Sequence, residues 1–528
     1  MSEDIGQKEI WWYRIPAWLP MGIVMALAFL LRSSGLTRSR GLFRDDAWMA
    51  LTSRVPFSDA LHMLVSAPGY TLVLRWWLSL HAGSTLWAQI PALAWGLLGV
   101  SSVMILAKIF GLPRWTWFSM GIVVAASPVA IAYSVRLKPY AFELVAAALL
   151  LAITEVIRRG GGRRWMLALA VLSGFSVASS LSLSSVVAGC WLALAVLCWK
   201  TRRLELGVSG VLAVALALPA ALWTAHSMPS SLGPSWSHYM LAPQGGPPSW
   251  PERFRLVFGG YVHGLLGVPM AHLSTGYGFA IFTLGASVMI FLLCLGLAAL
   301  KSEALAPAFV LAIAGALCFA GYLPLGTGRT DEVLYPATLL LLALGLVQAA
   351  RLARSLELPR EFASASLAAL LSAMVIGGVA NHAWYPLQRE GALYEDFKRF
   401  VKPGQPIVVE PKAGFTWAHE GLTTWKPVFD SHYLTGFAVR STNPNFILVD
   451  GLAATQQQQM DKLVSRLHDN RVVWYVGISA SVYSPSDTFR PKDNDLKPSP
   501  TWFWLLGLGF KPSYRFSRLG TVAVLMVR

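Results

Sequence analysis

Long apolar runs dominate the first three quarters of the chain. Runs of about 18 or more residues, each long enough to cross a bilayer as a helix, recur between Pro16 and Tyr385. Lipid offers no partner to unpaired backbone N–H and C=O groups, so such runs must cross as helices. Only 13% of the residues are charged, against about 25% in soluble globular chains. The sequence therefore predicts an α-helical polytopic membrane domain over residues 1–385.

Basic loops set the predicted topology, because lysine and arginine accumulate on the cytoplasmic side. The strongest are Arg158–Arg164, Lys200–Arg203 and Arg351–Arg360. About eleven transmembrane helices, each near the length that a bilayer needs, place all three loops inside. They cover residues 16–33, 86–108, 116–133, 139–157, 165–178, 181–198, 206–226, 277–299, 305–323, 333–350 and 364–385.

The segment Pro68–His81 would disturb this count as a further crossing. It is short, carries Arg75 in its middle, and has Trp76 and Trp77 beside it. Such a helix suits the membrane interface. With it lying there, the residues after the first span fall on the extracytoplasmic side.

Residues 386–528 have ordinary mixed polarity. Short apolar runs alternate with one polar helical pattern, which is typical of a small α/β layer. We expect an extracytoplasmic α/β domain that lies as a folded cap over the extracytoplasmic face of the membrane domain. Its predicted strands are residues 406–410, 445–450, 472–478 and 521–527, with a helix over 455–470.

Asp45 and Asp46 form an acidic pair in the stretch GLFRDDAW, shortly after the first span. Carboxylates are so costly near hydrocarbon that a pair at the membrane boundary is a functional candidate by default. The alternative is that they only cap an interfacial helix, a position that aspartate favours.

Two more outward segments bring cations to the same predicted face. Ser134–Glu143 (SVRLKPYAFE) carries Arg136 and Lys138, and Gly326–Glu332 (GTGRTDE) carries Arg329. Arginine pairs well with phosphate, since its planar fork can bind two oxygens at once. The competing interpretations are anchoring at lipid headgroups and, for Arg329, a local ion pair with Asp331 or Glu332.

The longest predicted outward loop, residues 227–276, is rich in Pro, Gly, Trp and Ser. A loop of this length favours a partly ordered lid. It contains His263, a candidate substrate contact, although loop histidines more often serve as hydrogen-bonding residues.

An outer face with both carboxylates and arginines suits attack of a hydroxyl on a sugar held by a lipid phosphate. An aspartate can act as the general base, and the cations can bind the departing phosphate. No glycine-rich nucleotide loop follows a predicted strand. The net charge of +16 favours contact with anionic membrane lipids over nucleic acid.

Taken in order, FRDDAW, SAPGYTLVLRWW, SPVAIAYSVRLKPYAFELVAAALLL and LPLGTGRTDEVLYPATLLLLALG resemble the GT-C superfamily of integral-membrane glycosyltransferases. The pattern is similar to bacterial dolichyl-phosphate-mannose-protein mannosyltransferase-like and aminoarabinose-transferase-like members. It covers residues 16–385.

This resemblance implies a polyprenyl-phosphate-linked sugar donor, an extracytoplasmic site in the bacterial plasma membrane and inverting transfer. The acceptor would be a glycolipid, a glycan or a protein. The acidic pair falls on Asp45 and Asp46, and the donor-phosphate contacts fall on Arg136, Lys138 and Arg329. The substrate-binding candidates are Tyr70, Tyr140 and His263.

The chain departs from the family pattern at two points. Asp-Asp stands where many members have Asp-Glu, and Arg-Leu-Lys-Pro where many have Arg-Glu-Ala-Arg. These departures leave open which aspartate is the base and whether a divalent metal ion (Mg or Mn) takes part; no other cofactor is implied.

Two other classes of function fit many of the same features. A lipid-linked-sugar flippase or secondary transporter would also have many spans, but transporters usually show inverted repeats and charges at the bilayer midplane. A non-catalytic polyprenol-binding scaffold would not need the aspartates for sugar transfer.

Overall fold

The structure is a computed structural model of the chain. It describes residues 16, 18–38, 42, 44–62, 67–81, 84–201, 204–227, 240–241, 249–266, 289–298, 302–327, 330–355, 397, 399–419, 425–429, 437–442, 445–448, 456–478, 499–518 and 521–528.

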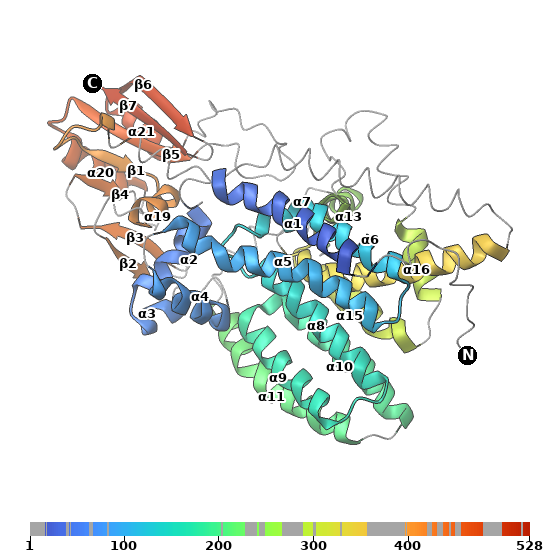
Figure 1. Ribbon diagram of the computed structural model, residues 1–528. Helices are drawn as coiled ribbons and strands as arrows, with labels where there is room; N and C mark the ends of the chain where they lie inside the picture. The colour runs from blue at the N-terminus through green and yellow to red at the C-terminus, as the bar shows by residue number, and fades with distance from the viewer. Residues whose placement is uncertain are drawn as a thin grey trace.

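Helices make up the described part of residues 1–385 (Figure 1). Five of them are long and apolar enough to cross a membrane, over Thr85–Ile109, Tyr140–Arg158, Leu181–Thr201, Glu205–Thr224 and Glu332–Leu352. Three shorter apolar helices cover Trp18–Ser33, Met289–Ala298 and Leu305–Phe319. The chain therefore has a multi-pass membrane architecture. The predicted span at 364–385 lies outside the described residues, as does part of the span at 277–299.

The helical bundle is organised around α8 (Tyr140–Arg158), whose side chains are buried along almost its whole length. It packs against α5 (Thr85–Ile109) and α9 (Arg163–Ser179), as well as α10 (Ser184–Thr201) and α16 (Tyr335–Ser355). Further out, α11 (Leu204–Ser227) lies along α9, and α15 (Leu305–Phe319) lies along α10. Outer helices such as α11 leave large apolar side chains exposed, the surface that suits contact with lipid tails.

The predicted span 116–133 is two helices in the structure, α6 (Arg114–Ala126) and α7 (Pro128–Tyr133). Pro128 disfavours a helical conformation at the residue before it. Ser127 is indeed not helical, with φ −59° and ψ 122°, and its hydroxyl caps α7 by accepting from the backbone N–H of Ala130 at 3.3 Å. This break, together with the first helix α1 (Trp18–Arg38), shapes the region that holds the acidic pair.

Three short helices follow α1: α2 (Arg44–Leu51), α3 (Phe57–His62) and α4 (Pro68–Leu80). The helix α4 is the segment predicted to lie in the interface. It buries Tyr70 and Leu74 and exposes Leu72 and Trp76. One face thus packs on the protein while the other is apolar and open, a distribution consistent with the interfacial placement, which remains a prediction.

Part of the predicted lid is a helix, α13 (Trp250–Leu266). It lies close to the loop at Gly326, because a Cβ on Gly260 would stand 2.8 Å from the carbonyl carbon of Gly326. Gly326 itself has a φ of 78°, a conformation that glycine adopts readily. Glycines at both positions therefore allow α13 and the segment at Gly326 to touch backbone to backbone.

The C-terminal region contains a five-stranded sheet in the order β4-β1-β5-β7-β6. The strands β4 (Phe446–Leu448), β1 (Ile407–Val409) and β5 (Val472–Ile478) are parallel, whereas β7 (Thr521–Val527) and β6 (Lys511–Arg518) join antiparallel. A separate hairpin pairs β2 (Trp425–Phe429) with β3 (Phe437–Ser441). The described helices of this region include α19 (Pro411–His419), α20 (Gln456–Leu467) and α21 (Pro500–Gly507).

The sheet region docks on the helices through α19, which packs against α2. Figure 1 shows α19, β2 and β3 at the same end of the bundle as α2, α3 and α4. The C-terminal region thus lies over the helix that carries Asp45 and Asp46.

Candidate active site

The acidic pair occupies the first turn of α2. Carboxylates are stabilised there, because the N-terminal end of a helix carries a partial positive charge. Trp48 lies about one turn further along the same helix. Starting a helix and taking part in chemistry are compatible roles, so this placement does not decide between the two interpretations of the acids.

Asp46 is held from two sides by the segment between α7 and α8. Its Oδ2 accepts a hydrogen bond from Nε of Arg136 at 2.8 Å, and its Oδ1 accepts one from the backbone N–H of Leu137 at 3.1 Å. The carboxylate is fully buried. A buried carboxylate with a guanidinium partner and a backbone donor is well satisfied, so Asp46 fixes the loop to α2.

Asp45 has a different environment although it is the next residue. Its side chain is 22% exposed, against 0% for Asp46, and its Oδ2 lies 3.8 Å from Nη2 of Arg136. Arg136 is 20% exposed and lies between the two acids. The geometry thus gives one enclosed carboxylate and one partly exposed carboxylate, with a guanidinium beside both.

Lys138 and Tyr70 belong to the same cluster. The ammonium nitrogen of Lys138 lies 4.2 Å from the ring centroid of Trp48, a cation–π contact. The hydroxyl of Tyr70 donates to the backbone carbonyl of Lys138 at 3.0 Å. Five of the predicted site residues therefore come together: Asp45, Asp46, Tyr70, Arg136 and Lys138.

The remaining predicted residues lie on other segments. Tyr140 opens α8 and packs its ring on Tyr133, with centroids 4.7 Å apart. His263 is buried on α13, the helix whose Gly264 carbonyl accepts from the hydroxyl of Ser127 at 2.7 Å. Arg329 lies outside the described residues.

Asp331, one of the two predicted ion-pair partners of Arg329, lies within the described residues. Its Oδ1 accepts from the backbone N–H of Gly326 at 2.8 Å. Asp331 therefore stabilises the turn that leads into α16.

Contacts from two other parts of the chain fix α2 and the turn after it. Arg75 of α4 donates to the carbonyls of Thr52, at 3.3 Å, and Val55. Arg54 donates to the carbonyl of His419 at the end of α19, at 2.9 Å. The ring of Trp48 also lies 6.2 Å from that of Phe415 on α19. The C-terminal region thus helps to set the position of the acidic pair.

Metal binding was left open by the sequence. Within the described ranges, no three His, Cys, Asp or Glu side chains gather closely enough to hold a metal ion. Both acids lie beside the guanidinium of Arg136.

Sequence reasoning missed several polar residues around this cluster. Gln89 of α5 donates to the carbonyl of Val135 at 3.0 Å, and Arg32 of α1 donates to the hydroxyl of Ser134 at 2.9 Å. Arg32 and Glu143 fall inside predicted spans, and Glu332 at the edge of one. An ionisable residue within a membrane span is itself a signal of function, and that signal could have found them.

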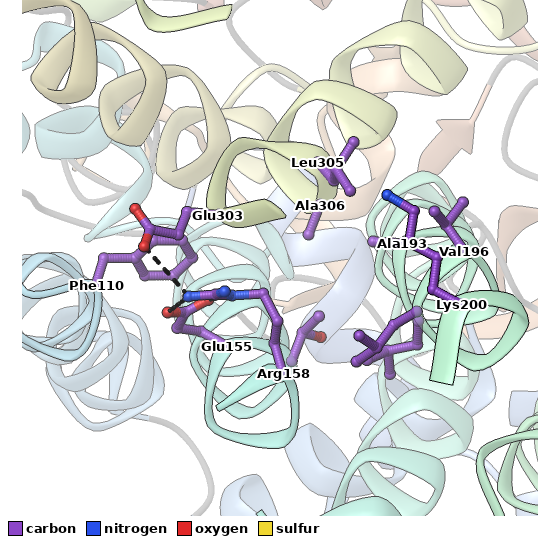
Figure 2. Close-up of a pocket in the computed structure, with 12 residues that line it drawn as sticks. Phe110, Glu155, Arg158, Ala193, Val196, Lys200, Glu303, Leu305 and Ala306 are labelled. Atoms are coloured by element: carbon purple, nitrogen blue, oxygen red, sulfur yellow. Dashed lines mark hydrogen bonds and ion pairs between the residues drawn. The ribbon is translucent and has the colours of Figure 1, made fainter. Parts of the chain in front are cut away.

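A second charged cluster lies at the other end of α8, about 27 Å from Tyr140 along the helix axis. There a hollow is lined by residues of α8, α10, α15 and the turn before α15, with Glu155, Arg158, Lys200 and Glu303 among them (Figure 2). Glu155 accepts from Nε of Arg158 and from Nε of Arg159, both at 2.6 Å. These opposite charges largely pair with one another, so we interpret this cluster as a group of ion pairs that stabilises the fold.

Replacing Glu155 tests that interpretation. Glu155→Gln should lower the free energy of unfolding by about 2 kcal/mol, since hydrogen bonds to charged groups are worth about 1.5–3 kcal/mol each but the two arginines remain partly solvated. The matched control is Glu303→Gln, because Glu303 is 38% exposed and its contact with Arg158 is longer, at 3.4 Å. We expect this variant to lose less than about 1 kcal/mol of unfolding free energy. Unfolding in a detergent titration measures both. Equal losses in the two variants would contradict the interpretation.

Comparison with known proteins adds information on the fold. No protein-family model and no curated protein sequence matches the chain. Among solved structures, ArnT from Cupriavidus metallidurans in the apo state is similar, with a TM-score of 0.53, 16% identity, and coverage of 96% of this chain and 97% of that one. ArnT bound to undecaprenyl phosphate gives a TM-score of 0.51 at 14% identity, with the same coverage. The likeness spans nearly the whole chain, so the chain shares the overall fold of ArnT, in agreement with the fold that the sequence resemblance predicted.

Proposed function

We propose that this protein transfers a sugar from a polyprenyl-phosphate-linked donor to a hydroxyl of an acceptor on the extracytoplasmic face of the bacterial plasma membrane. The acceptor is a glycolipid, a cell-envelope polysaccharide or a protein. The GT-C fold supports the class of reaction. ArnT, which shares the fold, has been crystallised bound to undecaprenyl phosphate, and this supports a polyprenyl phosphate as the lipid part of the donor here.

The observation that carries the proposal is the unequal setting of two adjacent carboxylates. Asp46 is enclosed and has donors on both oxygens, whereas Asp45 is 22% exposed beside the same guanidinium. A general base must reach the proton that it removes. We therefore assign the base to Asp45 and the positioning of Arg136 to Asp46.

The proposed reaction is a displacement at the anomeric carbon of the donor sugar. Asp45 removes the proton of the acceptor hydroxyl, and that oxygen attacks the anomeric carbon of the donor sugar. The bond between the anomeric carbon and the phosphate oxygen breaks on the opposite side, so the configuration inverts. Polyprenyl phosphate leaves with the bonding electrons, and Arg136 stabilises the developing negative charge. Arg136 is placed to do so because its guanidinium is 20% exposed and lies beside both acids.

Lys138 and the aromatic residues have supporting roles in this proposal. The Lys138 ammonium, stacked on Trp48, adds positive charge near the phosphate position. Tyr70 holds the backbone of Lys138 and forms one wall of the substrate site. Tyr140 and His263 remain proposed sugar contacts, and Arg329 a proposed phosphate contact.

Incubation with a panel of radiolabelled polyprenyl-phosphate sugars tests the function. The purified protein, with membrane extract as the source of acceptor, should convert one donor into a labelled product and release polyprenyl phosphate. Proteoliposomes loaded with the same donors provide the comparison. Movement of intact donor across the bilayer without transfer would identify a flippase, and binding without either process would identify a scaffold; both results would reject the proposal.

A further inference from the structure

We propose that Arg32 and Ser134 are positioning residues of the active site. The buried guanidinium of Arg32 fixes the end of α7 through Ser134, and thereby holds Arg136 and Leu137 against Asp46. This inference rests on the proposed function for its catalytic consequence, but its structural part can be measured without any substrate.

Arg32 uses both sides of its guanidinium to join two helices. Nη1 and Nη2 donate to the carbonyls of Ala125 and Val124, each at 3.0 Å, in the last turn of α6. Those carbonyls lack helical partners because α6 ends before Pro128. Nε donates to the hydroxyl of Ser134 at 2.9 Å, directly after α7. One fully buried side chain therefore sets the position of α7 relative to α6.

Ser134 transmits this position to the acidic pair over a very short stretch of chain. Its hydroxyl accepts from Arg32 and donates to the carbonyl of Ala130, so it is fixed in both roles. Two and three residues later, Arg136 and Leu137 bind Asp46. Because so few bonds separate these contacts, a shift of Ser134 must move the donors that hold the acid.

A buried acidic residue, Glu332 in the turn before α16, contributes an opposite charge to the surroundings of Arg32. Glu332 is fully buried and interacts electrostatically with Arg32. Within the described part of the chain, neither of its carboxylate oxygens accepts a hydrogen bond. A buried guanidinium requires such compensation. The hydrogen bonds of Arg32 connect α1, the end of α6 and the segment after α7.

Gly96 of α5 makes this junction possible and offers a way to disturb it. A Cβ at Gly96 would lie 2.6 Å from the Cβ of Ser134 and 3.2 Å from Nε of Arg32. Side-chain contacts of that kind do not occur without displacement, so Gly96→Ala should push Ser134 away from Arg32. Gly315 in α15 has nothing within 4 Å of the corresponding position and provides the matched control.

Hydrogen–deuterium exchange of the full-length protein in detergent tests the inference. In Gly96→Ala, peptides spanning residues 134–140 should exchange at least tenfold faster than in the wild type, because the Leu137 amide loses its fixed acceptor. Gly315→Ala should leave these peptides unchanged. Unchanged exchange in Gly96→Ala would overturn the proposal.

Ser134→Ala provides a second test that adds no bulk. It removes the acceptor of Arg32, and its control is Ser102→Ala, which deletes a hydroxyl that bonds only to the carbonyl of Gly99 in its own helix. In Ser134→Ala, faster exchange should be confined to residues 134–140, and kcat should fall at least tenfold while the KM for the donor changes less than twofold. A general increase in exchange across the bundle, or an unchanged kcat in an otherwise active enzyme, would reduce Arg32 and Ser134 to ordinary structural residues and contradict the proposal. Absence of transfer by the wild type would reject the proposed function and leave the exchange result to decide this inference.

Discussion

Asp45→Asn should lower kcat for sugar transfer by about 10²- to 10⁴-fold, the contribution expected of a general base. Asparagine keeps the size of the side chain but cannot take a proton from the acceptor hydroxyl. Donor binding should persist, because Arg136 and its hydrogen bond to Asp46 are untouched. Steady-state kinetics with the identified lipid-linked sugar separates the two effects.

The control for this variant is Asp59→Asn on the neighbouring helix α3, which should retain the wild-type kcat. Asp45→Glu places a carboxylate one methylene further out and should recover part of the activity. An Asp45→Asn enzyme that turns over as fast as the wild type would exclude Asp45 as the base.

Arg136→Met should be the most disruptive substitution for the cluster as a whole. It removes the guanidinium that pairs with the buried carboxylate of Asp46 at 2.8 Å, and breaking a buried ion pair by removing one partner costs about 3–5 kcal/mol of stability. The loss of the phosphate contact should also lower kcat by about 10²- to 10³-fold. Thermal unfolding and transfer assays measure the two effects.

A double variant separates stability from catalysis at this site. In Arg136→Met/Asp46→Asn the buried charge is gone, so much of the lost stability should return while activity stays low. If the double variant regains activity together with stability, then Arg136 acts only by compensating Asp46, and its proposed contact with the donor phosphate is wrong.

Hydropathy and charge predicted the helices well, because crossing a bilayer demands a long apolar run whatever the neighbours are. The spans predicted at 86–108 and 139–157 match α5 and α8 within one or two residues. The break at Ser127 was missed, although Pro128 was a visible signal. In the C-terminal region β1, β5 and β7 were predicted from their apolar runs, whereas β6, with its polar sequence KPSYRFSR, is a strand because it pairs with β7.

The candidate site was predictable in its residue types and only partly in its geometry. Spacing after the first span pointed to Asp45 and Asp46, and the loop before α8 pointed to Arg136. No local pattern distinguishes the two acids. Their difference lies in contacts with a distant segment, because the backbone N–H of Leu137 and the guanidinium of Arg136 both bond Asp46. The place of Arg32 inside a predicted span was a visible signal, but its role was not, because its partners Ser134 and the end of α6 lie about a hundred residues away in sequence.

The most direct test of the whole account is a single-turnover transfer experiment at saturating donor, comparing the wild type with Asp45→Asn in the same detergent. It isolates the chemical step from donor binding and product release. The account predicts that the wild type yields glycosylated acceptor and polyprenyl phosphate in equal amounts, while the variant binds the same quantity of donor and leaves it intact. Equal rate constants for the two proteins would contradict it.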